Sequence, residues 1–126
     1  MITNCHFSHL IQEQAKKYGE RTALQYRDYD KGEWVPISWN EFEDKVITVS
    51  NAMVALGVKV QENVAVFSQN MPEDLFVDFG AYGVRVVTIP FYPTSSSSQV
   101  KYMVDDAGVK IIFVGEQKQY DIAFPI

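Results

Sequence analysis

Three short apolar runs, separated by helix-like segments, dominate the second half of the chain. They lie at residues 64–67, 86–89 and 111–114, and none alternates between apolar and polar positions. Runs of this kind are typical of strands that are covered on both faces. Because successive parallel strands need a crossover, and a helix is the usual one, the order predicts a parallel sheet. We therefore expect an α/β fold: a partial, doubly wound parallel sheet with flanking helices, built on a βαβαβ unit over residues 63–126.

The segments between these runs carry helix start and stop signals. The first segment opens with Pro72, Glu73 and Asp74, which suit the amino-terminal end of a helix. The second opens in the serine run at residues 95–98, where Ser96 and Gln99 have capping-box spacing, and it ends at Gly108. A further helix begins near Gln117. The residues expected to be buried are Leu75, Phe76, Phe79 and Tyr82 in the first helix, with Gly80 and Gly83 allowing close approach to the sheet, and Val100, Met103, Val104 and Ala107 in the second.

The first half of the chain, residues 1–62, predicts a helix, a hairpin and a long helix. Residues 7–18 form an amphipathic pattern that ends at Gly19, and its apolar face includes Phe7, Leu10, Ile11 and Tyr18. Strand-like residues 22–27 and 33–37 flank a turn at 28–32. The long helix opens with a capping box at Ser38 and Glu41 and stops at Gly57. Its apolar face comprises Trp39, Phe42, Val46, Val49, Met53 and Leu56; a packed surface helix is favoured over a coiled coil because fewer than three heptads are present.

Composition narrows the class of protein. The chain has 126 residues, 47% of them hydrophobic, which suits one globular unit. Its formal net charge of -5 comes from scattered residues, so no basic stripe favours nucleic acid. No apolar run approaches the roughly 20 residues that cross a bilayer, and no signal-peptide pattern opens the chain. The single cysteine, Cys5, excludes an internal disulfide and favours a reducing compartment, so we expect a cytoplasmic location.

Candidate chemistry lies where the predicted strands end. Ligands of open parallel sheets bind beyond the carboxyl ends of the strands, here residues 68–70, 91–98 and 115–116. The serine run could hold phosphate, but capping and turn formation are favoured because no glycine-rich phosphate loop or dinucleotide motif is present. Cofactor-binding residues therefore stay unassigned.

Three other groups of side chains invite a catalytic or metal-binding interpretation. His6 and His9 are one helical turn apart and Cys5 is adjacent, yet a metal site needs further ligands, and this segment is terminal. Asp105 and Asp106 are expected to be solvated and to pair with Lys101 or Lys110. No serine lies in a nucleophile elbow. We assign no catalytic residue and no metal ligand.

Several segments nevertheless resemble one family. The run Asn70-Met71-Pro72-Glu73, the segment at 88–96 (TIPFYPTSS), and the later Gln99, Tyr102, Asp106, Gly108 and Lys110 are similar to the amino-terminal part of the adenylate-forming enzymes. Within that superfamily the long-chain fatty-acid CoA ligases are most similar, and the likeness runs from about Leu10 to Val114. Two positions depart from the family pattern: Arg85 replaces a small residue, and Gln61-Glu62 replaces a glycine-aspartate pair.

The resemblance implies a two-step ligase. In such enzymes ATP with Mg²⁺ activates a fatty acid as an acyl-adenylate, and coenzyme A then forms the thioester. The family's lysine-bearing phosphate loop, its ribose-binding aspartate and its catalytic lysine have no counterpart in this sequence. The resemblance therefore implies an amino-terminal fragment of the large AMP-binding domain, inactive when isolated, whose partners are the rest of its chain and the parent's substrates. It also implies a parent that is cytoplasmic or peripherally bound to a membrane.

Two alternatives stay open. One is a freestanding flavodoxin-like binding or interaction module without catalysis. The other is self-association of the fragment through apolar surfaces and unpaired strand edges.

Overall fold

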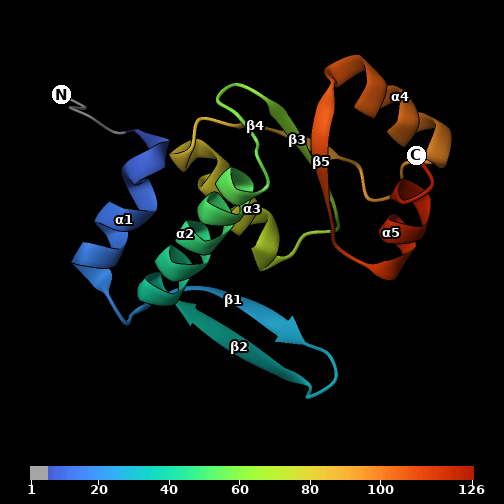
Figure 1. Cartoon of the computed structure of the whole chain (residues 1–126). Helices are drawn as coiled ribbons and strands as arrows, with labels where there is room; N and C mark the ends of the chain where they lie inside the picture. Colours follow the sequence, from blue (N-terminus) through green and yellow to red (C-terminus); the bar gives the residue numbers. More distant parts are fainter. Residues whose placement is uncertain (1–5) are drawn as a thin grey trace.

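The computed structural model describes residues 6–126 and folds them into an α/β arrangement (Figure 1). Within these residues β1 and β2 form an antiparallel hairpin, and three parallel strands form a sheet in the order β4-β3-β5. The α/β class, the hairpin and the parallel sheet are therefore confirmed. The elements in chain order are α1 (Phe7–Tyr18), β1 (Thr22–Asp28), β2 (Glu33–Ser38), α2 (Trp39–Ala55), β3 (Asn63–Phe67), α3 (Pro72–Gly83), β4 (Val87–Phe91), α4 (Ser97–Ala107), β5 (Val109–Val114) and α5 (Gln117–Ala123).

The strand order explains why helices cover both faces of the parallel sheet. The chain moves from β3 to β4 in one direction and then returns across β3 to reach β5. Because parallel crossovers are nearly always right-handed, this reversal puts α3 and α4 on opposite faces. Figure 1 shows α2 and α3 on one side of the sheet and α4 and α5 on the other. The doubly wound arrangement predicted from the sequence is present.

The central strand β3 supplies residues to two hydrophobic cores, one on each face of the parallel sheet. Its side chains alternate, so Val64 and Val66 pack with α2 and α3, while Ala65 and Phe67 pack with α4 and α5. All four are buried, as the uninterrupted apolar run predicts.

The same prediction is wrong for the two edge strands. In β4 Val87 is 40% exposed, and most of β5 is only half-buried. Each of these strands has one strand neighbour in the part of the chain that the structure describes. Pro90 fits β4 because an edge strand tolerates a residue without an amide hydrogen.

A third core joins the hairpin to the helices. Phe42 of α2 lies at its centre, with ring centroids 5.4 Å from Phe76 and 5.9 Å from Phe79 of α3. Ile11 of α1 is buried in the same cluster, which also includes Ile37 of the hairpin. Aromatic contacts of this geometry add to the burial energy, so α1, the hairpin and α2 are tied to α3.

Three residues that the sequence pattern assigns to buried faces are exposed. Phe7 is 62% exposed because it lies in the first turn of α1, where it stacks on the edge of the core against Tyr82. Leu56 is 66% exposed because it lies just beyond the last turn of α2. Leu75, 41% exposed, lies in the first turn of α3, where the neighbouring Phe76 and Val77 are the residues that contact the cores. Helical periodicity predicted the faces but not where each face ends.

The glycines of α3 permit a close approach to α2, not to the sheet as predicted. A Cβ atom built on Gly80 would lie 2.9 Å from Val49 Cγ1 and 3.2 Å from the carbonyl oxygen of Val46. Ser50 Oγ donates a hydrogen bond of 2.6 Å to the carbonyl oxygen of Gly80. The small residue therefore lets the two helices approach each other closely.

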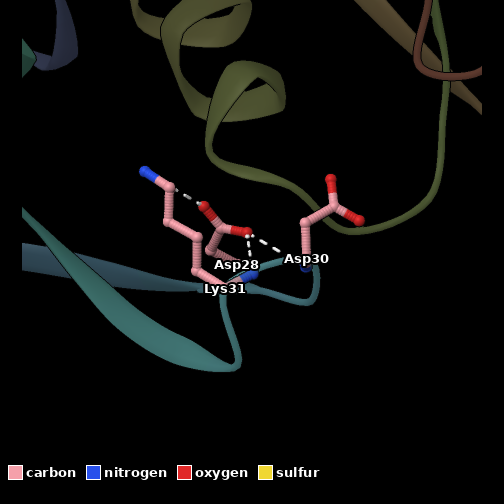
Figure 2. A network of polar contacts seen from close by, with 3 residues as sticks. All are labelled: Asp28, Asp30 and Lys31. Carbon is pink, nitrogen blue, oxygen red and sulfur yellow. Dashed lines mark hydrogen bonds and ion pairs between the residues drawn. The ribbon is translucent and has the colours of Figure 1, made fainter.

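The hairpin turn is organised by one aspartate, as Figure 2 shows. Asp28 Oδ1 accepts hydrogen bonds from the backbone amides of Asp30 at 3.1 Å and Lys31 at 3.0 Å. Lys31 Nζ lies 3.8 Å from Asp28 Oδ2, and Gly32, with φ of 68°, closes the turn. Aspartate stabilises turns in this way because its short carboxylate reaches the amides two and three residues ahead.

The predicted capping boxes are both present. Ser38 Oγ accepts from the amide of Glu41 at 3.1 Å, and Glu41 Oε2 accepts from the amide of Ser38 at 2.7 Å. Ser96 and Gln99 make the same pair of bonds at the start of α4, at 3.4 and 2.8 Å. The sequence therefore located the starts of these two helices correctly.

Candidate functional site at the carboxyl edge of the sheet

The carboxyl ends of β3 and β5 form the switch point of the sheet. After β3 the chain turns towards α3 on one face, and after β5 it turns towards α5 on the other. Such a divergence leaves a crevice between neighbouring strands, and open α/β sheets bind ligands there. Of the predicted edge segments, the structure brings residues 68–70 and 115–116 together at this point.

Gly115 and Ser68 meet at the switch point with no room for another atom. The Gly115 amide donates a hydrogen bond of 3.1 Å to the carbonyl oxygen of Phe67. A Cβ atom on Gly115 would lie only 2.5 Å from Ser68 Cβ and 3.0 Å from Gln69 Oε1. A side chain at position 115 would therefore collide with the end of β3.

The Ser68 hydroxyl links the sheet edge to α3. Ser68 Oγ lies 2.6 Å from Asp74 Oδ1 and 2.6 Å from the carbonyl oxygen of Gln69. The single hydroxyl proton serves one acceptor at a time, and a carboxylate is the stronger acceptor. Beside this pair, Gln69 Oε1 is buried with no hydrogen-bond partner in the described part of the chain. A buried, unpaired amide oxygen is costly, and a donor from a ligand or from further protein would stabilise it.

A cavity of about 290 Å³ opens beside Ser68, between the sheet and α3. Its walls are mainly apolar side chains from α2, α3, β3 and β5, and its polar lining consists of Ser68, Glu73 and Asp74. None of the described residues in the lining has a basic side chain, so they can accept an apolar group but offer nothing to neutralise a phosphate. The apolar lining residues are Val49, Val66, Met71, Phe76, Val77, Phe113 and Val114.

Asp78 is the one described residue of the chain with a clearly shifted pKa. Burial raises the pKa of its carboxyl, a hydrogen bond with the Thr88 side chain lowers it, and the negative charge of Asp74 raises it further. Together these effects raise the pKa of Asp78 above its ordinary value, so the folded state disfavours the charged carboxylate. Asp78 lies on α3 one turn beyond Asp74 and faces Thr88 of β4.

The carboxyl end of β4 is separate from this crevice. Tyr92 is 82% exposed, Ser95 is buried, and the Ser95 amide donates to the carbonyl oxygen of Tyr92 at 2.9 Å. Gln119 of α5 donates to the carbonyl oxygen of Pro93 at 3.3 Å. The serine run therefore serves a turn and the cap of α4, the roles favoured from the sequence.

The remaining candidate side chains lie elsewhere. The rings of His6 and His9 are 6.1 Å apart, and Cys5 lies outside the described residues. Within residues 6–126 no three His, Cys, Asp or Glu side chains gather in a way that could hold a metal ion. Asp105 pairs with Lys101 at 2.8 Å on the exposed face of α4. None of the described helices has the length and apolar character needed to span a bilayer.

A family model described as AMP-binding enzyme matches residues 11–124. The chain belongs to this family. The resemblance noted from the sequence is therefore confirmed, and the match covers every element except the beginning of α1 and the last two residues.

Curated relatives of the chain include long-chain fatty-acid CoA ligases. FadD15 of Mycobacterium bovis is 29% identical over 97 residues, which is 75% of this chain and 16% of the relative. ACSBG1 of Homo sapiens is 29% identical over 112 residues, 89% of this chain and 15% of the relative. The chain therefore spans about one sixth of the length of the curated relatives it matches.

Solved structures show the same fold at lower identity. The Mycobacterium tuberculosis fatty acyl CoA synthetase superposes with a TM-score of 0.82 at 17% identity, covering 96% of this chain and 23% of that one. An anthranilate CoA ligase in complex with anthranoyl-AMP superposes with a TM-score of 0.83 at 16% identity, covering 96% and 22%.

Sequence reasoning missed one contact at this site and one backbone feature at the opposite edge of the sheet. It placed residues 68–70 and 115–116 at one edge but not the contact of Gly115 with Ser68, because strand order decides which ends are neighbours. It also missed the positive φ of Gln61 (66°) and Arg85 (58°). The sequence did offer a signal for this conformation: Arg85 replaces a small residue of the family, and Gln61 replaces a glycine. Glycine adopts a positive φ freely.

Proposed function

We propose that this chain is the opening portion of the AMP-binding domain of an ATP-dependent long-chain fatty-acid CoA ligase. Such a ligase joins a fatty acid to AMP with release of pyrophosphate and then transfers the acyl group to coenzyme A. The observation that carries the proposal is the family match over residues 11–124, together with curated relatives of that activity. We further propose that the parent works in the cytoplasm, either free or peripherally bound to a membrane.

Within this proposal residues 1–62 supply a helix, hairpin and long helix, and residues 63–126 supply the βαβαβ unit. Their role is to form one wall of the large domain. The parent would use ATP, Mg²⁺ and coenzyme A, but the crevice in this chain does not fit a metal-bound triphosphate by itself. Its charged lining residues, Glu73 and Asp74, are acidic, and a phosphate needs cationic or amide donors. We therefore propose that the isolated chain is inactive and assign no catalytic step to its residues.

A segment exchange tests the proposal directly. The aligned segment of Mycobacterium bovis FadD15 is replaced by this chain, and palmitoyl-CoA formation from palmitate, ATP and coenzyme A is measured. We expect the chimera to make the thioester, because the inserted segment has the same fold as the segment that it replaces and keeps the contacts at the strand ends. FadD15 with its own segment is the positive control, and the isolated 126-residue chain is assayed for ATP–pyrophosphate exchange, where we expect none.

Two results would contradict the proposal. The first is a chimera that folds, with the circular dichroism spectrum and thermal transition of FadD15, but adenylates no fatty acid. That result would show that this segment comes from a protein with another activity. Robust exchange by the isolated chain would show that it is not inactive.

A second proposal is that the isolated chain self-associates. The specific observation is a group of exposed apolar side chains at and just beyond the end of α2: Val54 is 60% exposed, Leu56 66% and Val60 54%. Exposed apolar groups of this kind mark contact surfaces. A monomeric mass by light scattering at millimolar concentration would refute it.

A further inference from the structure

A second and larger cavity lies at the opposite, amino edge of the sheet. Its volume is about 610 Å³, and it is lined by the first turn of α1, the turn before β3 and the connection from α3 to β4. The lining residues with polar side chains are His6, Ser8, His9, Gln61, Tyr82 and Arg85. None of them contributes to the carboxyl-edge crevice, so the two cavities are independent.

The chemistry of this lining favours an anion. Arg85 carries a permanent positive charge and five N–H donors, and Gln61 and Tyr82 add neutral donors. Among residues 6–126 no Asp or Glu side chain lines the cavity, although the chain as a whole has a net charge of -5. A donor-rich, carboxylate-free lining in an acidic protein is complementary to a negatively charged ligand.

His6 is fixed beside the cavity by the start of α1. Its Nδ1 lies 2.6 Å from Ser8 Oγ and 3.3 Å from the Ser8 amide nitrogen, so its side chain caps the helix.

Two of the lining residues, Gln61 and Arg85, have a backbone conformation that costs free energy for a residue with a side chain. Gln61 and Arg85 both have φ in the left-handed region, 66° and 58°. The Gln61 amide donates to the carbonyl oxygen of Arg85 at 2.7 Å, and the Val87 amide donates to that of Glu62 at 2.9 Å, so the two strained residues hold each other. Glycine would adopt this conformation without strain. The stability of the fold would favour glycine at position 85, so it does not explain why arginine is present there.

We propose that this cavity is a binding site for a phosphate-bearing anion, with Arg85 as its principal contact. Arginine presents a planar fork that matches phosphate oxygens. The volume exceeds what one inorganic phosphate fills and lies in the range of sites for small metabolites. The stacked rings of Phe7 and Tyr82, 6.0 Å apart, supply an apolar wall for the organic part of the ligand. The proposal goes beyond the ligase function and does not depend on it.

The test uses inorganic pyrophosphate as a free probe, titrated calorimetrically into the 126-residue chain at constant ionic strength. We expect saturable binding that weakens about tenfold or more in Arg85→Gln, because a charge-assisted hydrogen bond is lost. Arg21→Gln is the matched control: it removes one positive charge from an exposed residue that does not line the cavity, and it should bind within about twofold of the wild type.

Arg85→Gly separates binding from folding. It should raise the melting temperature by removing strain and at the same time lose pyrophosphate binding. A merely structural role for Arg85 cannot produce that combination. Vesicles of phosphatidylcholine with and without phosphatidic acid form a second arm: binding that needs both phosphatidic acid and Arg85 would identify a lipid headgroup as the source of the phosphate. Wild-type affinity for both probes in Arg85→Gln and Arg85→Gly, or no binding of either probe by the wild type, would overturn the proposal.

Discussion

Replacing Gly115 by alanine should destabilise the protein through a single contact at the switch point. The new Cβ atom would lie 2.5 Å from Ser68 Cβ, 2.9 Å from Ser68 Oγ and 3.0 Å from Gln69 Oε1. Rotation of the Ser68 side chain cannot relieve the first contact, because Cβ is fixed to the backbone. The ends of β3 and β5 must therefore separate, and the hydrogen bond from Gly115 to Phe67 is stretched.

The magnitude follows from two effects. Overpacking of a tight site typically costs about 1–3 kcal/mol. Displacement of Ser68 also weakens its hydrogen bond to Asp74, and bonds to charged groups contribute roughly 1.5–3 kcal/mol when buried. Since both groups are only partly buried, we expect a total loss of roughly 2–4 kcal/mol in the free energy of unfolding.

Urea unfolding followed by circular dichroism measures this loss. With m of about 2 kcal/mol/M, the midpoint should fall by about 1–2 M at unchanged m. Ser68→Gly removes the colliding Cβ atom but also the hydrogen bond to Asp74, so it should destabilise the Gly115→Ala background less than it destabilises the wild type. A Gly115→Ala variant within about 0.5 kcal/mol of wild type, or additive effects of the two changes, would refute the steric argument.

Three further predictions concern α2 and α3. Gly80→Ala should cost about 1–3 kcal/mol, because its Cβ would lie 2.9 Å from Val49 Cγ1, and Val49→Ala should recover part of that loss; additive effects in urea would contradict the contact. Burial raises the folded-state pKa of Asp78 above the unfolded value of 3.8, so wild-type stability should fall as pH rises from 3.8 through the elevated pKa. Asp78→Asn should flatten this part of the profile of Tm against pH and should stabilise the protein at neutral pH; parallel profiles would contradict the assignment. Ser38→Ala should cost about 1 kcal/mol by removing a cap of α2, with a conservative Ser38→Thr variant close to wild type in thermal unfolding.

Local signals in the sequence located most elements of this fold. The capping box at Ser38 and the one at Ser96 predict the starts of α2 and α4, because their reciprocal bonds involve residues only three apart. The hairpin turn is likewise set by Asp28 and Gly32 within five residues. Such features need no tertiary information.

The errors arise where tertiary neighbours decide the outcome. Three apolar runs look alike in the sequence, yet only β3 is covered on both sides, because the order β4-β3-β5 leaves the other two at the edges of the described sheet. The glycines of α3 signal a close approach but not its partner, which is α2. At the candidate site the sequence identified the strand ends, whereas the contact of Gly115 with Ser68 depends on which strands are adjacent.

The central position of β3 has a consequence for synthesis on the ribosome. β3 is the first strand of its sheet to emerge, yet one of its two neighbours, β5, is translated last of the three. Until Val114 has left the exit tunnel, one side of β3 lacks its hydrogen-bonding partner, and Ala65 and Phe67 lack much of their cover. The hairpin and the early helices can form during this delay because their contacts are close in the sequence, whereas the sheet closes late. The nascent chain therefore has a defined interval in which one edge of β3 is open to pairing with another strand.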